Sequence, residues 1–276
     1  MTAVPAIRAR RQRVQGAATG VAVLKGLAHL GGRASLSVLA ARLGESAPKL
    51  HRYLVSLIEE GLVAQDPATT QYYLGPEAIG IGLAAMSQSD PIRVAEPGLA
   101  RLRDELAVTA FVAVPGNRGP TIVRMLEPGL PVTIKVCVGS VLSPLWSATG
   151  RAFLAWCDDA GLRAAAQQEL AAATPAQRAG LAGRGSQAAG GDPIDRLCRQ
   201  IRDQGCALVK DIYQAGISAV AVPVFDHAGR VCAVLTALGA TGGFDASIGG
   251  PPAQAVRREA QAASHRLGHA VVVPMS

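Results

Sequence analysis

The pattern of apolar and polar positions predicts three helices and a hairpin in the first quarter of the chain. Apolar side chains recur at helical spacing over residues 21–30, 37–43 and 46–60, and a glycine follows each of these runs. Two shorter runs, 62–65 and 71–74, flank a cluster of turn-forming residues and predict a two-stranded hairpin. The predicted order is therefore helix, helix, helix, hairpin.

Serines are expected to cap the second and third of these helices. Ser37 and Ser46 stand at the start of the two apolar runs, and a serine oxygen readily accepts a hydrogen bond from the first N–H groups of a helix. Pro48 falls in the first turn of the third helix, where its missing N–H costs little. The third helix is therefore expected to begin near Ser46.

The remainder of the chain alternates helical stretches with short β-rich runs. Weakly amphipathic segments at 76–89 and 91–105 predict connecting helices. Strands are expected at 111–114, 121–126, 132–138, 217–224 and 231–238, and further helices at 148–156 and 253–267. The alanine- and glycine-rich segment 158–192 indicates no firm element. These elements predict an α+β fold whose larger part contains an antiparallel sheet.

The second and third predicted helices have the form of a helix-turn-helix. The third helix has an apolar face of Leu50, Leu54, Leu57 and Ile58 and a polar face of Lys49, Arg52 and Ser56. A helix with one packed face and one cationic face can enter the major groove of DNA, which is about 12 Å wide. Arg52 is the first choice for a base or phosphate contact. Lys49 and the N–H groups at the helix start are expected to meet phosphate.

Other residues near this helix extend the predicted DNA contact. The complete predicted set is Ser37, Ser46, Ala47, Lys49, His51, Arg52, Ser56, Thr70 and Tyr72. For each member the alternative is a solvated surface side chain. His51 lies between the two helix faces, where packing or hydrogen bonding is favoured over a base contact. Thr70 and Tyr72 belong to the predicted hairpin, whose tip either touches DNA or is a plain solvated turn.

The distribution of charge agrees with a polyanionic partner for the N-terminal part. The formal net charge is +7, and residues 1–75 contain nine Lys and Arg against four Asp and Glu. Four of these arginines lie in residues 1–13, which form either an arm that contacts phosphate or a solvated tail without a role. The basic first quarter is thus where a DNA partner is expected.

Composition and motifs speak against several other classes of protein. The five cysteines are widely spaced in apolar runs without a CxxC pair, which is typical of small buried side chains, so neither metal nor cofactor is expected. No GxSxG elbow, HExxH motif or Walker loop supports an enzyme. No signal peptide or membrane span is expected, and the predicted location is the cytoplasm.

Motifs along almost the whole chain resemble the IclR family of bacterial transcriptional regulators. In the N-terminal part they are VAVL (21–24), LAARLG (39–44), HRYL (51–54), EEGLV (59–63) and YLG (73–75). In the C-terminal part they are SATGRAFLA (147–155), GCA (205–207), GI (216–217) and AVAVPV (219–224). Together, in this order and spacing, these motifs are specific.

The resemblance implies a DNA-binding transcriptional regulator controlled by a small molecule. A basic flexible tail is expected at 1–13, a winged helix-turn-helix at 14–76, a linker helix at 77–93, and a GAF-like effector-binding and oligomerisation domain at 94–276. Family members bind palindromic double-stranded operators as dimers or dimers of dimers, and they sense organic acids or aromatic metabolites. The alternative is a ligand-independent regulator or interaction module with a degenerate pocket.

The resemblance also implies an effector site, although several of its positions depart from the family pattern. The matching positions are Trp146, Ala148, Thr149, Gly150, Val209, Asp211, Ala219, Thr236 and Leu238. Trp146 stands where the family often has histidine, Ala219 replaces a common cysteine, and Leu238 replaces a small hydroxyl residue. A mostly apolar wall favours an effector larger and less polar than glyoxylate-like acids. Its carboxylate would bind N–H groups near Ala148, assisted by Thr149.

Overall fold

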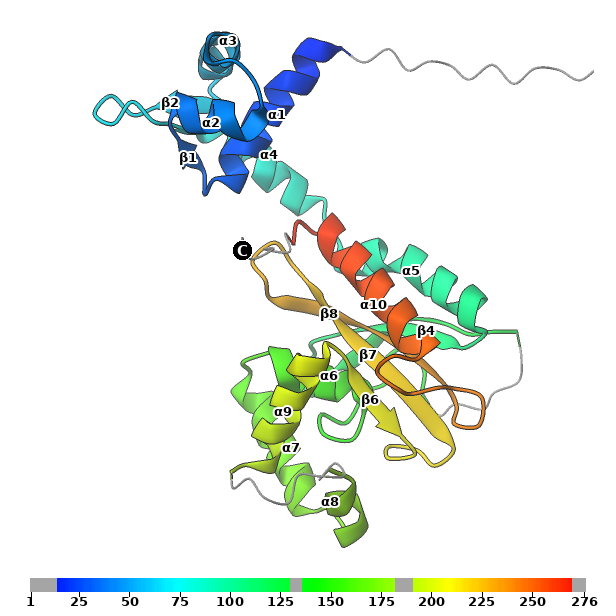
Figure 1. Ribbon diagram of the computed structural model, residues 1–276. Coiled ribbons are helices and arrows are strands. Elements are labelled where there is room, and N and C mark those ends of the chain that lie inside the picture. Colours follow the sequence, from blue (N-terminus) through cyan, green and yellow to red (C-terminus); the bar gives the residue numbers. More distant parts are fainter. Residues whose placement is uncertain (1–13, 130–135, 182–190, 270–276) are drawn as a thin grey trace, which may run out of the picture. The chain divides into compact units, whose positions relative to one another are not determined.

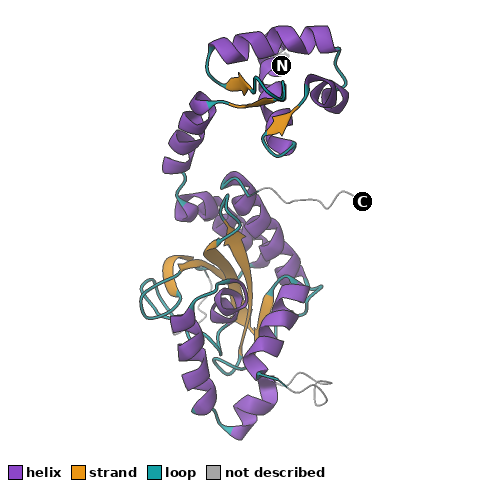
Figure 2. Ribbon diagram, turned by 90° about the vertical axis from the view of Figure 1, so that its left-hand side faces the viewer, coloured by secondary structure: helices purple, strands orange, loops and turns teal. Residues whose placement is uncertain are grey.

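The protein consists of two compact units, residues 1–88 and 89–276, each with its own hydrophobic core. The computed structural model describes residues 14–129, 136–181 and 191–269. The predicted basic tail at 1–13 lies outside the described residues. Figures 1 and 2 show the helices and strands of both units.

The N-terminal unit has the predicted order of three helices and a hairpin. Its elements are α1 (Gln15–His29), β1 (Arg33–Ala34), α2 (Leu36–Leu43), α3 (Ala47–Glu59), β2 (Val63–Gln65), β3 (Tyr72–Leu74) and α4 (Pro76–Ser87). The three strands form an antiparallel sheet in the order β1-β3-β2. A helix-turn-helix followed by a β-hairpin is the winged helix-turn-helix architecture.

Three details of this unit differ from the sequence prediction. The capping residue of α2 is Ser35, whose Oγ accepts a hydrogen bond from the N–H of Val38 at 3.4 Å, so Ser37 lies inside the first turn. Ser46 does precede α3, but its side chain makes no capping hydrogen bond. Strand β1 was not predicted, because these two residues become a strand only by pairing with β3.

The core of the N-terminal unit lies where α1, α2 and α3 meet the small sheet. Its buried side chains are Val23, Leu27, Ala34, Leu39, Leu50, Leu54, Val63 and Tyr72. Leu50 and Leu54 were predicted for the packed face of α3, whereas Ile58 at the end of that face is exposed. Val21 is exposed as well, because the face of α1 that packs on the core carries Thr19, Val23 and Leu27.

The C-terminal unit is an antiparallel sheet with helices on both faces. Its elements are α5 (Pro91–Leu106), β4 (Thr109–Val114), β5 (Thr121–Leu126), α6 (Ala148–Trp156), α7 (Ala160–Ala171), α8 (Pro175–Leu181), α9 (Pro193–Gln204), β6 (Ala207–Lys210), β7 (Ile217–Phe225), β8 (Val231–Ala240) and α10 (Pro251–Arg266). The strand order is β5-β4-β8-β7-β6. Helices α5 and α10 pack on one face, and α6 packs on the other with α9 beside it (Figure 1).

Alternation along the central strands divides this unit into two cores. On β8, Val234 and Leu238 join the core under α6, whereas Leu235 and Ala237 join the core under α5 and α10. Because successive side chains of a strand point to opposite faces, a sheet covered on both faces reads as a nearly continuous apolar run. The start of α6 thus lies against the middle of the sheet, where the effector site was predicted.

Several predictions for this unit were incomplete or wrong. Helices α7 and α8 lie within the segment 158–192, for which no element was expected, and α9 follows directly after it where no helix was predicted. The expected strand at 132–138 lies largely outside the described residues, and its described end, 136–138, is not a strand. Cys198 and Cys206 are buried as expected, but Cys137 is exposed.

Candidate DNA interface and effector cavity

The outer face of α3 presents an exposed cation that is free to meet another molecule. Arg52 is exposed, and within the described part of the chain its guanidinium makes no ion pair. Leu50 and Leu54 anchor the opposite face in the core. The helix can therefore contact DNA through Arg52 without losing its own packing.

The two other polar residues predicted for this face are engaged within the protein. Lys49 Nζ lies 2.8 Å from Glu45 Oε1, and this pair offsets much of the lysine charge at the start of α3. The Ser56 hydroxyl donates to the carbonyl oxygen of Arg52 at 3.4 Å. Lys49 must therefore leave or share Glu45 to meet phosphate, and Ser56 is better placed to accept a hydrogen bond than to donate one.

An open groove of about 480 Å³ lies between the start of α2, α3 and the hairpin. It brings together five of the predicted residues, namely Ser37, Ala47, His51, Thr70 and Tyr72. Ser35, Leu36 and Gln65 complete its lining and were not predicted. The Tyr72 side chain is only 4% exposed, and its hydroxyl lies 3.4 Å from His51 Nδ1. Tyr72 is thus placed to orient His51.

The hairpin that forms the wing is held by bonds within itself and to β1. Asp66 accepts N–H groups of Ala68 and Thr69 at 2.9 and 3.1 Å, and Arg33 Nη1 lies 2.8 Å from its Oδ2. These backbone hydrogen bonds, followed by that of Arg33, hold the pKa of Asp66 below its ordinary value. Thr70 has a left-handed φ of 58° and donates its hydroxyl to the Thr69 carbonyl at 2.7 Å. The tip is thus a preformed turn.

Six of the nine predicted effector residues line a small cavity between α6 and the sheet. Ala148, Thr149, Val209, Ala219, Thr236 and Leu238 all line it. The unpredicted lining residues are Phe111, Val136, Leu142, Ser147, Tyr213, Gln214 and Ile217. Phe111 could have been found from the strand register, because it pairs with Thr236 across β4 and β8. Among the described residues, no charged side chain lines this cavity.

Two of the polar side chains that line the cavity are paired with each other. Thr149 Oγ1 and Thr236 Oγ1 lie 2.8 Å apart and are buried, and Ser147 Oγ accepts the N–H of Gly150 at 2.9 Å. The cavity volume is about 40 Å³, which holds a water molecule or two, whereas ligand pockets measure roughly 300–1,000 Å³. A metabolite therefore does not fit into the cavity unless the residues that line it move apart.

Three predicted effector residues do not line this cavity. Trp146 is buried in the core beside it. A Cβ atom on Gly150 would lie 2.1 Å from the carbonyl oxygen of Ser143, so glycine is required there for close packing. Asp211 Oδ1 accepts the N–H of Gly216 at 2.9 Å and the hydroxyl of Thr241 at 2.7 Å, and so holds the turn between β6 and β7.

A buried arginine supports the loop before α6. Arg151 Nε donates to the carbonyl oxygen of Leu145 at 2.7 Å, and Glu169 Oε2 accepts the N–H of the same residue at 2.9 Å. Among the described residues, no group accepts a hydrogen bond from the buried Nη2 of Arg151, and burial lowers the pKa of Arg151 to about 10. Hydrogen bonds to Arg151 and to Glu169 thus hold the loop before α6 at one edge of the cavity.

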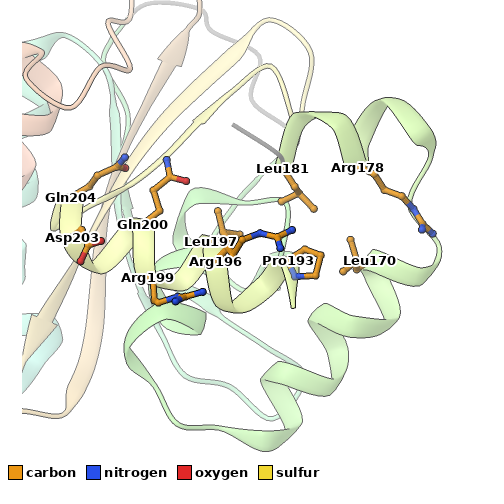
Figure 3. A pocket seen from close by; sticks show the side chains of 10 residues that line it. All are labelled: Leu170, Arg178, Leu181, Pro193, Arg196, Leu197, Arg199, Gln200, Asp203 and Gln204. Atoms are coloured by element: carbon orange, nitrogen blue, oxygen red, sulfur yellow. The ribbon is translucent and has the colours of Figure 1, made fainter. Parts of the chain in front are cut away.

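A second, larger hollow lies among α7, α8 and α9, outside the predicted site (Figure 3). It measures about 690 Å³, with Leu170, Leu181 and Leu197 in its wall and arginines around them. One of these, Arg178, donates to the carbonyl oxygens of Ala171 and Ala173 at 2.8 and 3.1 Å. Arg178 thus caps the C-terminal end of α7.

Three further features concern the cysteines, metal-binding groups and membrane-spanning helices. Burial raises the pKa of the Cys157 and Cys232 thiols to about 11, so neither is a thiolate at neutral pH. The described residues contain no group of three or more His, Cys, Asp or Glu side chains that could hold a metal ion. None of the described helices is both long and apolar enough to cross a membrane.

Two family models match the chain and together cover most of it. The model described as "IclR helix-turn-helix domain" matches residues 17–67. The model described as "Bacterial transcriptional regulator IclR C-terminal" matches residues 83–265. The first match contains the helix-turn-helix, and the second contains the sheet and the cavity.

Individual relatives include both curated regulators and solved structures. The chain is 27% identical over 195 residues to the HTH-type transcriptional regulator XynR of Escherichia coli, covering 70% of this chain and 73% of that protein. It is 28% identical over 221 residues to the Pca regulon regulatory protein of Pseudomonas putida, covering 79% and 72%. The crystal structure of Pseudomonas aeruginosa HmgR shares 38% identity with a TM-score of 0.82, covering 94% of this chain and 100% of that one.

Proposed function

The chain belongs to the IclR family of bacterial transcriptional regulators, and from that premise we propose that α3 binds operator DNA and that the cavity under α6 binds the effector. The observation that supports the DNA contact best is the exposed, unpaired guanidinium of Arg52 on a helix whose opposite face is buried. A helix of this kind presents side chains to base edges in the major groove. Footprinting of the full chain on DNA upstream of its own gene tests this. A protected site with two related halves is expected, and absence of any sequence-specific protection contradicts the proposal.

Two parts of the N-terminal unit are proposed to contact the operator. Arg52 reads a base or phosphate, and the groove lined by Ser37, Ala47, His51 and Thr70 lies against the sugar-phosphate backbone. Tyr72 acts through His51. The predicted tail at 1–13 would add phosphate contacts, which a deletion of residues 1–13 tests by a smaller salt dependence of binding.

Self-association is the second part of the proposal. Ile79, Ile81, Leu83 and Met86 on α4 are exposed, although apolar side chains gathered on one helix usually become buried in an interface. We assign α4, within the predicted linker 77–93, to contact with a second copy of this chain, because a two-fold assembly doubles the bases that a short helix can read. Analytical ultracentrifugation should show a dimer or tetramer, and Leu83→Asp should weaken it. A monomeric wild-type chain contradicts this part.

The effector proposal is a molecule with an apolar body and one carboxylate or hydroxyl end. Phe111 and Leu238 offer the body apolar contacts, while Thr149 and Thr236 can each exchange their mutual hydrogen bond for one to the ligand. Trp146, first expected to face the ligand, does not reach this cavity. Thermal unfolding with aromatic and aliphatic monocarboxylates should show stabilisation. Stabilisation by small dicarboxylates and oxoacids alone contradicts the proposal.

The small volume of the cavity favours one competing function. A cavity of only about 40 Å³ is also what a ligand-independent regulator with a degenerate pocket would have. The two are separated by DNA binding in the presence of candidate acids. A sensor changes its operator affinity with the acid that stabilises it, whereas a ligand-independent regulator binds the operator equally with every acid.

A further inference from the structure

Val55 stands out on the outward face of α3. Exposed side chains recur there every three or four residues, at Pro48, Arg52, Val55 and Glu59. Val55 is the apolar member, and 41% of it is exposed. It belongs neither to the buried core of the N-terminal unit nor to the partly buried side chains that pack on it. Folding of the unit therefore gives no reason for an apolar residue at this position.

Helix formation does not explain the residue either. Valine is β-branched, and on the exposed side of a helix it is less favourable than alanine, glutamate or lysine. Its neighbour Ser56 has its hydroxyl turned back to the Arg52 carbonyl. Between Arg52 and the end of the helix, the outward face thus offers a methyl-bearing surface where polar groups would be easier to hydrate.

One feature of the major groove complements such a surface. Of the four bases only thymine presents a methyl group there, and apolar side chains pack against it. At about 1.5 Å per residue, Arg52 and Val55 are separated by about 4.5 Å along the helix axis. Successive base pairs are about 3.4 Å apart. In a helix that lies along the groove, this spacing allows the two side chains to meet adjacent base pairs.

We propose that Val55 is a specificity-determining residue that packs against the 5-methyl group of a thymine, next to the base pair that Arg52 contacts. This inference rests on the proposed entry of α3 into the major groove. It assigns an A·T pair with a fixed strand orientation to a defined position in each half of the operator, because only one orientation places the methyl group beside the helix.

Replacing thymine by deoxyuridine tests the contact, since it removes only the methyl group. The full chain first selects a duplex from a random library, and each thymine of one half-site is then replaced in turn. Removing one buried methyl group should weaken wild-type binding about fourfold at one position. Val55→Ala should bind the unsubstituted duplex about fourfold more weakly and should lose its response to deoxyuridine at that position alone.

Controls separate this inference from the proposed function on which it rests. Because Val55 is exposed and alanine favours the helix more than valine, Val55→Ala should unfold at the wild-type temperature or slightly above it. Arg52→Ala should keep the deoxyuridine response. The inference is overturned if no deoxyuridine weakens wild-type binding, or if Val55→Ala retains the full response. If the chain selects no duplex at all, the proposed DNA contact itself is wrong.

Discussion

The outer face of α3 and the cavity under α6 differ in how far their polar groups are already satisfied. On α3, Arg52 is exposed and has no ion pair within the described chain. In the cavity, Thr149 and Thr236 are buried and bonded to each other. Arg52 can thus meet a partner without giving up an ion pair, whereas a ligand that bonds to either threonine must replace the hydrogen bond between them.

This difference provides a physical basis for control of DNA binding by an effector. A ligand shifts an equilibrium only by the difference between its affinities for the two states. For the proposed effector site, the two states would be the present arrangement, in which Thr149 and Thr236 bond to each other, and a wider one in which they bond to the ligand. The predictions below disturb the cavity, the opposite face of the same sheet, and the proposed DNA face.

The largest effect is expected where the closed cavity depends on close packing. An alanine Cβ at position 150 would lie 2.1 Å from the Ser143 carbonyl oxygen and 2.6 Å from Pro144 Cα, so Gly150→Ala must push α6 away. We expect a loss of about 3 kcal/mol in the unfolding free energy. Both tryptophans, Trp146 and Trp156, lie in the C-terminal unit, so their fluorescence reports its unfolding.

Gly243→Ala serves as the matched control, because no atom lies within 4 Å of the added Cβ there. Its unfolding free energy should stay within about 0.5 kcal/mol of wild type. Equal stability of Gly150→Ala and wild type would show that α6 is not held as closely as described.

A smaller effect is expected on the opposite face of the same sheet, which has no part in the cavity. Glu259 is 4% exposed, and Arg101 donates to its Oε2 at 2.6 and 3.0 Å. Burial alone would raise the pKa of Glu259, but hydrogen bonds from Arg101 and Arg258 outweigh it and hold the pKa below 4.5. Glu259→Gln should cost about 2 kcal/mol at neutral pH.

The sign of the pH dependence follows from the lowered pKa of Glu259. A lowered pKa in the folded state adds stability above the unfolded-state value, and that stability is lost as the pH falls through the folded-state value. The difference between wild type and Glu259→Gln should therefore shrink in denaturant unfolding below pH 4.5. A difference that stays constant with pH would assign the loss to packing.

The hydroxyl pair of the cavity should show a non-additive effect. Thr236→Val leaves the Thr149 hydroxyl buried without its partner and should cost about 1 kcal/mol of unfolding free energy, and Thr149→Val should do the same. The double variant replaces both partners and should be close to wild type in stability, yet it should lose the stabilisation by a carboxylate effector. Additive losses in denaturant unfolding would contradict the pairing.

The smallest effect is expected on the DNA face, at the lysine that the protein already neutralises. Glu45→Gln removes the partner of Lys49 Nζ, which lies 2.8 Å away, and should raise DNA affinity about twofold. Lys49→Ala should then lower affinity more in the Glu45→Gln background than in wild type. Equal effects of Lys49→Ala in both backgrounds, measured by fluorescence anisotropy, would show that the pair does not restrain Lys49.

The sequence predicted those parts of the fold whose pattern is local. The limits of α6 and β5 agree with prediction, because each run is bounded by its own capping or turn residues. Helix α9 was overlooked although Ile194, Leu197, Cys198 and Ile201 recur at helical spacing. Strand β1 could not have been predicted, since two residues carry no periodicity and their pairing with β3 is a long-range contact.

The two candidate sites were predicted from the sequence to different extents, again because only local patterns can be read from it. A helix face follows from spacing, so the exposure of Arg52 and the burial of Leu54 could be derived from the sequence. Contacts between side chains could not be derived in this way, and the ion pair between Lys49 and Glu45 appears only in the structure. The same holds for Trp146, because spacing does not show which side of a loop faces a cavity.

Comparison of Arg52→Ala with wild type on specific and random DNA tests the central claim most directly. We predict that the variant loses about 1–3 kcal/mol of binding free energy on the selected operator and discriminates less at one base pair of each half-site. Its affinity for random DNA should change far less, and Arg118→Ala, an exposed arginine of the C-terminal unit, should behave as wild type on both. Unchanged operator affinity, or an equal loss on both DNAs, would contradict base reading by α3.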